Sequence, residues 1–129
     1  MALVVPSASE ETMLDIILNV TAAQTLILRL YTNNVTPGEA SVAATFTEAT
    51  GFGYSAITLT PGTWTTTPGN PSTAAYPQQT FTFTGALGNV YGYYITQMTS
   101  GFLMWAELFT DGPYNIVNPA MLKRNLRKN

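Results

Sequence analysis

The side chains best suited to acid–base chemistry in this chain are seven carboxylates, and five of them fall into two close groups. Glu10, Glu11 and Asp15 form one group, and Glu107 and Asp111 form the other. A glycosidase needs two carboxylates that face each other about 5–10 Å apart. A helix N-terminus explains Glu10 and Glu11, because the helix dipole stabilises acids there, and Asp111 opens an Asp-Gly-Pro turn. Glu107 is left as the best catalytic candidate.

Glu107 also has a structural explanation. In the strand predicted around it, Glu107 shares a face with Leu103, Trp105 and Phe109, where an unpaired charge is costly. Arg29 is the one base that precedes residue 122. We therefore predict a structural ion pair between Arg29 and Glu107 in preference to a catalytic carboxylate.

The chain contains no cysteine and no histidine. Disulfides, thiolate metal sites, cysteine nucleophiles, Ser–His dyads and ordinary zinc sites are therefore excluded. We predict a protein that is not an enzyme and that uses no cofactor, metal or small-molecule substrate.

Four aromatic residues are candidates for a surface platform on which neutral sugars stack: Trp64, Tyr91, Tyr93 and Trp105. The alternative is that these rings belong to the core and rim of a sheet. A nucleic-acid groove should be basic, and the segment that holds these rings contains no Lys or Arg. Nucleic acid is therefore not an expected partner.

The other four bases lie at the end of the chain, and residues 119–129 are predicted to form a basic C-terminal arm. Its candidate partner-binding residues are Met121, Leu122, Lys123, Arg124, Leu126, Arg127 and Lys128. The apolar members follow a roughly helical spacing, which suits a docking arm, and the alternative is a solubilising tail. Exposed ion pairs contribute about 0.2–1 kcal/mol each, so the arm needs apolar burial or many copies to hold a partner.

Composition predicts one folded domain. Charged residues make up 9% of the 129 residues and hydrophobic residues 46%, whereas an average soluble domain is about 25% charged. The length suits a single β-rich domain over residues 1–118. The apolar N-terminus is too short for a signal peptide and no later segment is long enough to span a bilayer, so neither secretion nor a membrane is expected.

The local pattern predicts one short helix followed by strands. A helix over about residues 9–20 is favoured by the capping-box spacing of Ser7 and Glu10, with Ser9 an equally good N-cap. Residues 26–31 alternate as a central strand, with Leu26, Leu28 and Leu30 toward the core and a half-exposed second face. Turn formers follow at residues 33–38.

Further strands follow at short intervals. They are predicted over residues 54–60, 62–67, 79–84, 89–97 and 102–109, with a weaker alanine-rich candidate over 42–46. In residues 80–84 phenylalanine alternates with threonine, so that threonine replaces charge on the outer face. The fold class predicted is mainly β, an antiparallel β-sandwich or barrel-like domain with one short N-terminal helix.

Several segments together resemble small structural proteins encoded by tailed phages, including cyanobacterial phages. The segments are residues 30–37, 47–50, 76–81, 89–94 and 105–107. The resemblance spans most of residues 3–111, and each motif is short. It implies a mainly β protein of the virion, a head decoration or cement protein on the outer capsid surface, and it transfers no catalytic residue.

Two functions are kept as hypotheses. The first is a virion structural protein that binds and stabilises the lattice of the major capsid protein, as a homo-oligomer. The alternative is a carbohydrate-binding or host-recognition module of a phage tail or baseplate, which would use the aromatic platform.

Overall fold

The protein is mainly β, with one α-helix in the part of the chain that the structure describes. The computed structural model describes residues 6–18, 24–70, 72–117 and 120–128, with the backbone alone for residues 8, 15–17 and 120–128. The helices are α1 (Ser7–Ile17) and the short 3₁₀ segments η1 (Ala43–Thr45) and η2 (Pro61–Thr63). The strands are β1 (Leu26–Tyr31), β2 (Ile57–Leu59), β3 (Thr65–Thr67), β4 (Thr73–Phe83), β5 (Gly88–Val90), β6 (Gly92–Gln97), β7 (Leu103–Leu108), β8 (Tyr114–Ile116) and β9 (Ala120–Lys128).

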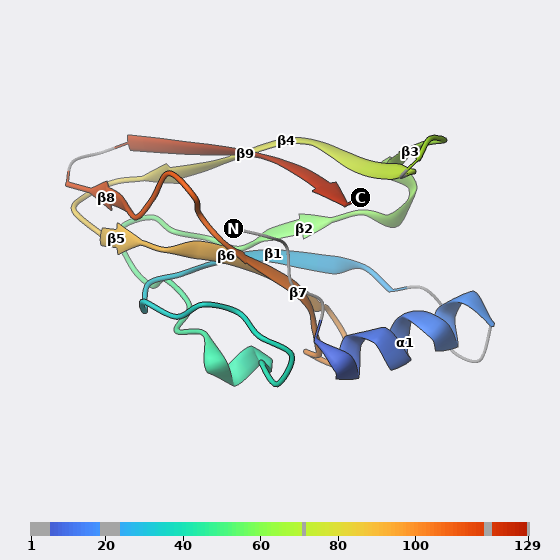
Figure 1. Ribbon diagram of the computed structural model, residues 1–129. Helices are drawn as coiled ribbons and strands as arrows, with labels where there is room; N and C mark the ends of the chain where they lie inside the picture. Colours follow the sequence, from blue (N-terminus) through green and yellow to red (C-terminus); the bar gives the residue numbers. More distant parts are fainter. Residues whose placement is uncertain (1–5, 19–23, 71, 118–119, 129) are drawn as a thin grey trace.

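The strands form three antiparallel sheets. A four-stranded central sheet has the order β2-β1-β6-β7, a three-stranded outer sheet has the order β3-β4-β9, and β5 pairs with β8. Figure 1 shows the outer sheet above the central sheet, with α1 and η1 below the central sheet. The predicted mainly β class, with antiparallel sheets and one short helix, is confirmed. The choice between a sandwich and a barrel stays a prediction.

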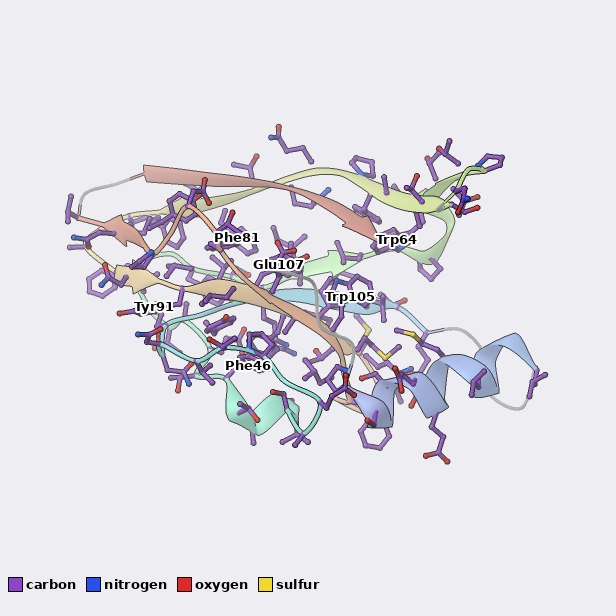
Figure 2. All side chains as sticks on the ribbon, in the orientation of Figure 1. Phe46, Trp64, Phe81, Tyr91, Trp105 and Glu107 are labelled. Carbon is purple, nitrogen blue, oxygen red and sulfur yellow. The ribbon has the colours of Figure 1, made fainter. Side chains whose placement is uncertain are left out.

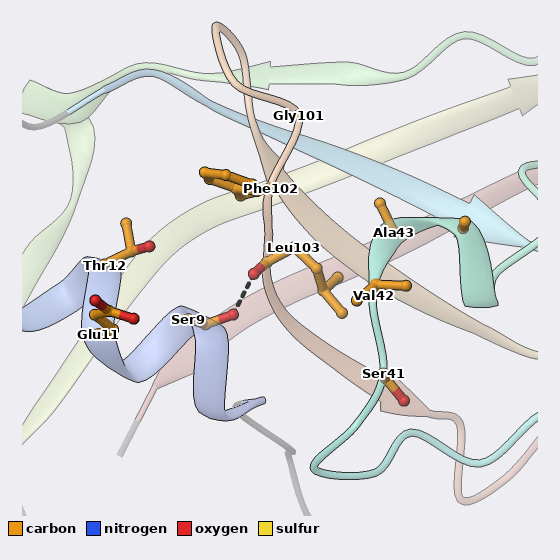
Figure 3. Close-up of a pocket in the computed structure, with 10 residues that line it drawn as sticks. Ser9, Glu11, Thr12, Ser41, Val42, Ala43, Gly101, Phe102 and Leu103 are labelled. Atoms are coloured by element: carbon orange, nitrogen blue, oxygen red, sulfur yellow. Dashed lines mark hydrogen bonds between the residues drawn. The ribbon is translucent and has the colours of Figure 1, made fainter.

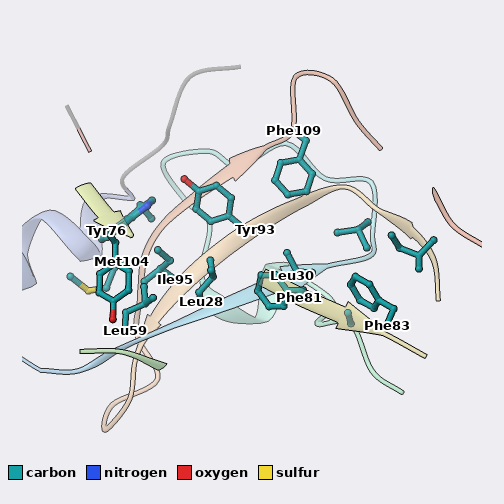
Figure 4. Packing of buried hydrophobic residues seen from close by; sticks show 14 residues of the cluster. Leu28, Leu30, Leu59, Tyr76, Phe81, Phe83, Tyr93, Ile95, Met104 and Phe109 are labelled. Carbon is teal, nitrogen blue, oxygen red and sulfur yellow. The ribbon is translucent and has the colours of Figure 1, made fainter. Parts of the chain in front are cut away.

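The main core lies between the central and outer sheets (Figure 4). Leu28 and Leu30 project into it from β1, and Phe81 and Phe83 project into it from β4. All four side chains are buried. The predicted core face of the first strand is therefore confirmed at Leu28 and Leu30, and the alternating phenylalanines of β4 supply the facing layer.

The opposite face of the central sheet carries a second cluster, here called the aromatic core. Its rings are Tyr31, Phe46 and Tyr94, with centroids 4.8 Å apart for Tyr31–Phe46 and 5.0 Å apart for Phe46–Tyr94. Leu103 and Ala106 complete it. Tyr31 is fully buried, so the prediction of a half-exposed second face is wrong there, because the segment that carries Phe46 covers it.

Several predicted elements differ from the observed ones; for example, the strand predicted over residues 62–67 is divided between η2 and β3, and β4 begins before residue 79. The helix begins at Ser7 instead of residue 9, because the backbone N–H groups of Ser9 and Glu10 both donate to the Pro6 carbonyl and form the first turn. The end of the predicted helix, at residue 20, lies outside the described residues. Residues 42–46, predicted as a weak strand, contain η1, which is consistent with the low β-propensity of alanine.

The C-terminal residues belong to the outer sheet. β9 pairs along nearly all of β4, with Leu122 opposite Phe81 and Leu126 opposite Tyr76. The prediction of a separate arm over residues 119–129, with helical spacing of its apolar residues, is therefore wrong for the strand. Leu122 and Leu126 fit the alternation of side chains along a strand. Each pairs with a buried residue of β4.

A β-bulge changes the faces of β7. Ile95 pairs with Trp105, whereas the next residue, Thr96, pairs with Leu103, so Met104 is the extra residue. Trp105 and Met104 both enter the main core, and Leu103 enters the aromatic core. The predicted common face of Leu103 and Trp105 is therefore wrong.

Gly92 lies where β6 is most closely enclosed. It pairs with Tyr31 on one side and with Leu108 on the other. A Cβ at this position would overlap the Glu107 carbonyl oxygen and the Tyr31 ring. Glycine is therefore required here by close packing.

We expect Gly92→Ala to lower the free energy of unfolding by about 1–3 kcal/mol, because the added methyl must displace the backbone of β7 or the ring of Tyr31. Urea unfolding followed by circular dichroism measures the change. Gly62→Ala is the control, since a Cβ at Gly62 meets no atom within 4 Å. Equal stability of the two variants would contradict the packing argument.

Candidate functional site

Arg29 forms its ion pair with Glu48. One guanidinium nitrogen of Arg29 lies 2.8 Å from Glu48 Oε1, and Arg29 Nε donates to Thr96 Oγ1 at 3.0 Å. The predicted pair of Arg29 with Glu107 is therefore wrong. Arg29 is paired in register with Tyr94, whereas Glu107 is paired with Tyr93 on the adjacent position of β6, and successive residues of a strand face opposite sides of the sheet.

Glu48 also anchors a tyrosine. The Tyr54 hydroxyl donates to Glu48 Oε2 at 2.8 Å and accepts the Leu30 backbone N–H at 3.1 Å. Both carboxylate oxygens of Glu48 are thus used, one by Arg29 and one by Tyr54. These contacts hold the segment after η1 against β1, which is a structural role.

The buried tyrosines hold their protons strongly. Burial raises the pKa of Tyr94 to about 12, and the charge of Glu48 adds to the rise. Burial also raises the pKa of Tyr31 and of Tyr54. The hydrogen bond from the Leu30 N–H lowers the pKa of Tyr54, whereas the hydrogen bond to Glu48 raises it further.

The four rings predicted as a surface platform do not form one. Tyr93 and Trp105 are buried in the main core. Trp64 is half-buried and packs edge-on against Trp105, at a centroid distance of 6.0 Å. Tyr91 packs against the aromatic core, on the other face of the central sheet, and Figure 2 shows it far from Trp64 and Trp105. The platform prediction is therefore wrong, because Tyr93 and Trp105 are buried and Tyr91 lies on the other face of the central sheet.

The predicted partner-binding residues of the C-terminus are placed by their backbone alone. Residues 120–128 form β9, which is an edge strand of the outer sheet. Lys123 pairs with Thr80 and Arg127 with Ala75. The bases thus lie along a sheet edge.

An open cavity that sequence reasoning missed lies among the described residues (Figure 3). It has a volume of about 540 Å³ and lies between α1, η1 and the turn that leads into β7. Its lining residues are Ser9, Glu11, Thr12, Ser41, Val42, Ala43, Ala44, Gly101, Phe102 and Leu103. We call it the α1 groove. These residues come from three separate segments, so no local pattern could have brought them together.

The α1 groove has apolar walls and an acidic rim. Phe102 and Val42 are large apolar residues that remain 62% and 53% exposed. Glu11 lines the groove, and Glu10 and Glu39 are exposed on the neighbouring turns. The arrangement suits binding of a basic, partly apolar surface more than catalysis.

Two serines attach α1 to the rest of the protein. The buried Ser9 hydroxyl donates to the Leu103 carbonyl at the start of β7 (Figure 3). The exposed Ser7 hydroxyl donates to Glu39 Oε2 at 2.9 Å. Ser9 was predicted as a possible N-cap, and the structure gives its hydroxyl this tertiary contact instead.

Some classes of site are absent from the described part of the chain. Those residues contain no group of three or more potential metal ligands. None of their helices has the length and apolar character of a membrane span. The chain matches no family model, no curated protein and no solved structure.

Ser9→Ala is expected to lower the free energy of unfolding by about 1–3 kcal/mol, because the buried Leu103 carbonyl loses its donor. Hydrogen exchange of the α1 amides should also become faster. Ser7→Ala is the matched control, with a change below about 0.5 kcal/mol at an exposed site. Unchanged exchange in Ser9→Ala would show that the hydroxyl does not hold the helix.

Alkaline pH is expected to destabilise the fold. Below about pH 10, the ordinary tyrosine pKa, folded and unfolded states are both protonated, so the stability is complete. Above it the unfolded chain loses protons that Tyr31, Tyr54 and Tyr94 retain, and each costs about 1.4 kcal/mol per pH unit until its folded pKa is reached. Urea unfolding between about pH 8 and pH 11 measures this loss. Stability that stays constant over this range would contradict it.

Proposed function

We propose that this protein is a non-enzymatic virion structural protein that decorates the outer capsid surface by binding the major capsid protein. The observation that carries the proposal is an uncharged, threonine-rich segment that runs from β2 to β4 and exposes many of its threonines. Its exposed threonines are Thr58, Thr60, Thr63, Thr65, Thr66, Thr67, Thr80, Thr82 and Thr84. The resemblance to small phage structural proteins supplies the class of partner.

Exposed threonines suit close packing against a protein lattice. Burying a threonine side chain requires no desolvation of charge, which is the costly step when ionised groups enter an interface. Threonine is also β-branched and stiff at χ1, so little side-chain entropy is lost on binding. Its hydroxyl can hydrogen-bond with a partner. A contact of this kind repeated over a lattice does not require high affinity per copy.

The two best-placed carboxylates of the described interior support a structural role. Glu48 is occupied by Arg29 and Tyr54. Glu107 pairs with Tyr93, whose side chain lies in the main core. The charge of Glu107 adds to the raised pKa of Tyr31. Glu10 and Glu11 occupy the first turns of α1, where the helix dipole stabilises them.

The alternative, a carbohydrate-binding or host-recognition module of a tail or baseplate, rested on an aromatic platform. Tyr93 and Trp105 are buried, and Trp64 and Tyr91 lie in different clusters. No observation now favours this alternative over decoration of the capsid.

The proposal is tested by locating the chain in purified particles of the phage that encodes it. Mass spectrometry should give a fixed ratio to the major capsid protein, and electron microscopy should place it on the outer head surface. Thr66→Asp/Thr82→Asp should reduce occupancy about tenfold or more by placing charge in the contact. Thr110→Asp, an exposed threonine outside this segment, is the control. Absence from heads, or location at the tail tip, would overturn the proposal.

A further inference from the structure

Three exposed acidic residues lie on or beside the α1 groove. Glu10, Glu11 and Glu39 are exposed on or beside it. Among the side chains that the structure describes, the one base is Arg29, and it is paired with Glu48. The acids of the groove therefore have no base of the described set to neutralise them.

The remaining four bases lie on the other side of the molecule, in β9. β9 is an edge strand, because it pairs with β4 alone among the described strands. Figure 1 shows β9 above the central sheet and α1 with η1 below it. The central sheet thus separates the acidic groove from the basic strand within one copy.

We infer that copies of this chain associate head to tail, with the α1 groove of one copy against the β9 edge of the next. Opposite charges that are separated within one copy meet between copies. A groove-to-groove contact would bring acids together, and a β9-to-β9 contact would bring bases together, so both symmetric arrangements are disfavoured. The contact is heterologous and leaves each copy with one free groove and one free β9 edge, unless a ring closes.

The groove also supplies apolar contacts, which exposed ion pairs lack. Phe102 and Val42 are exposed at its walls, and their burial adds an apolar contribution to each copy-to-copy contact. Exposed ion pairs alone are weak and are screened by salt. Both the charged residues and the apolar residues of the groove are therefore needed for association.

This inference goes beyond the proposed function and does not depend on it. Head-to-tail association is a property of the isolated protein, whereas capsid binding concerns another chain. Each has its own experiment, so the failure of one leaves the other standing.

Sedimentation of the full chain over a range of concentrations tests the association. Assemblies larger than a monomer are expected at about 0.05 M salt, with a dissociation constant about tenfold higher or more at about 0.5 M. Glu10→Gln/Glu11→Gln and Phe102→Ser should each weaken association about tenfold or more. The controls are Asp111→Asn and Val117→Ser, which remove an exposed acid and an exposed apolar side chain away from the groove.

A mixing experiment distinguishes head-to-tail from symmetric association. One variant carries Glu10→Lys/Glu11→Lys and keeps β9, and the other carries Lys123→Gln/Arg127→Gln and keeps the groove. Each should be monomeric alone, and together they should form a one-to-one complex that does not grow. Neutralising the bases is preferred to deleting the end of the chain, because deletion would remove part of a strand that pairs with β4.

Three outcomes would overturn the inference. The first is a wild-type chain that stays monomeric at low salt, even if its groove binds another basic protein. The second is association that survives the groove variants as well as it survives their controls. The third is a mixture of the two variants that forms no complex, although each variant keeps the wild-type circular dichroism spectrum and unfolding midpoint.

Discussion

Burial of β6 on both faces is the constraint on which the rest of the structure depends. All of its residues from Gly92 to Gln97 are buried, so the chain must provide a cover for each side of the central sheet. The outer sheet provides one cover through Phe81 and Phe83, and the segment around Phe46 provides the other. A strand enclosed in this way excludes charge from its own positions, which explains part of the charge-free central segment.

The second cover is held by polar contacts that lie at its edges. Glu48, in the segment that follows Phe46, binds Arg29 of β1 and the hydroxyl of Tyr54, which packs against the main core, and Ser9 joins α1 to the start of β7. Because these contacts satisfy groups that would otherwise lose water, they determine where the covering segment and helix lie. The α1 groove is a consequence of that placement, since its walls come from α1, η1 and the turn before β7.

The low charge of the chain has two consequences in the folded protein. From β2 to β4 it leaves a segment without charged residues that exposes many threonines, and a threonine side chain can contact a neighbouring protein at little desolvation cost. Among the charges that remain, three exposed acids lie on or beside the α1 groove and four bases lie in β9. A molecule with this distribution presents acids on one side and bases on the other, as the proposed head-to-tail contact requires.

Much of the fold was predictable from local pattern. The alternation of Leu28, Leu30 and the phenylalanines of β4 determined strands and their buried faces, because side chains alternate with period two wherever a strand forms. The partner of Arg29, the burial of Trp105 and the strand character of β9 were decided only by tertiary structure. Each depends on the register of strands distant in sequence, on a bulge, or on which segment covers a face, and a local pattern carries no information about these long-range choices.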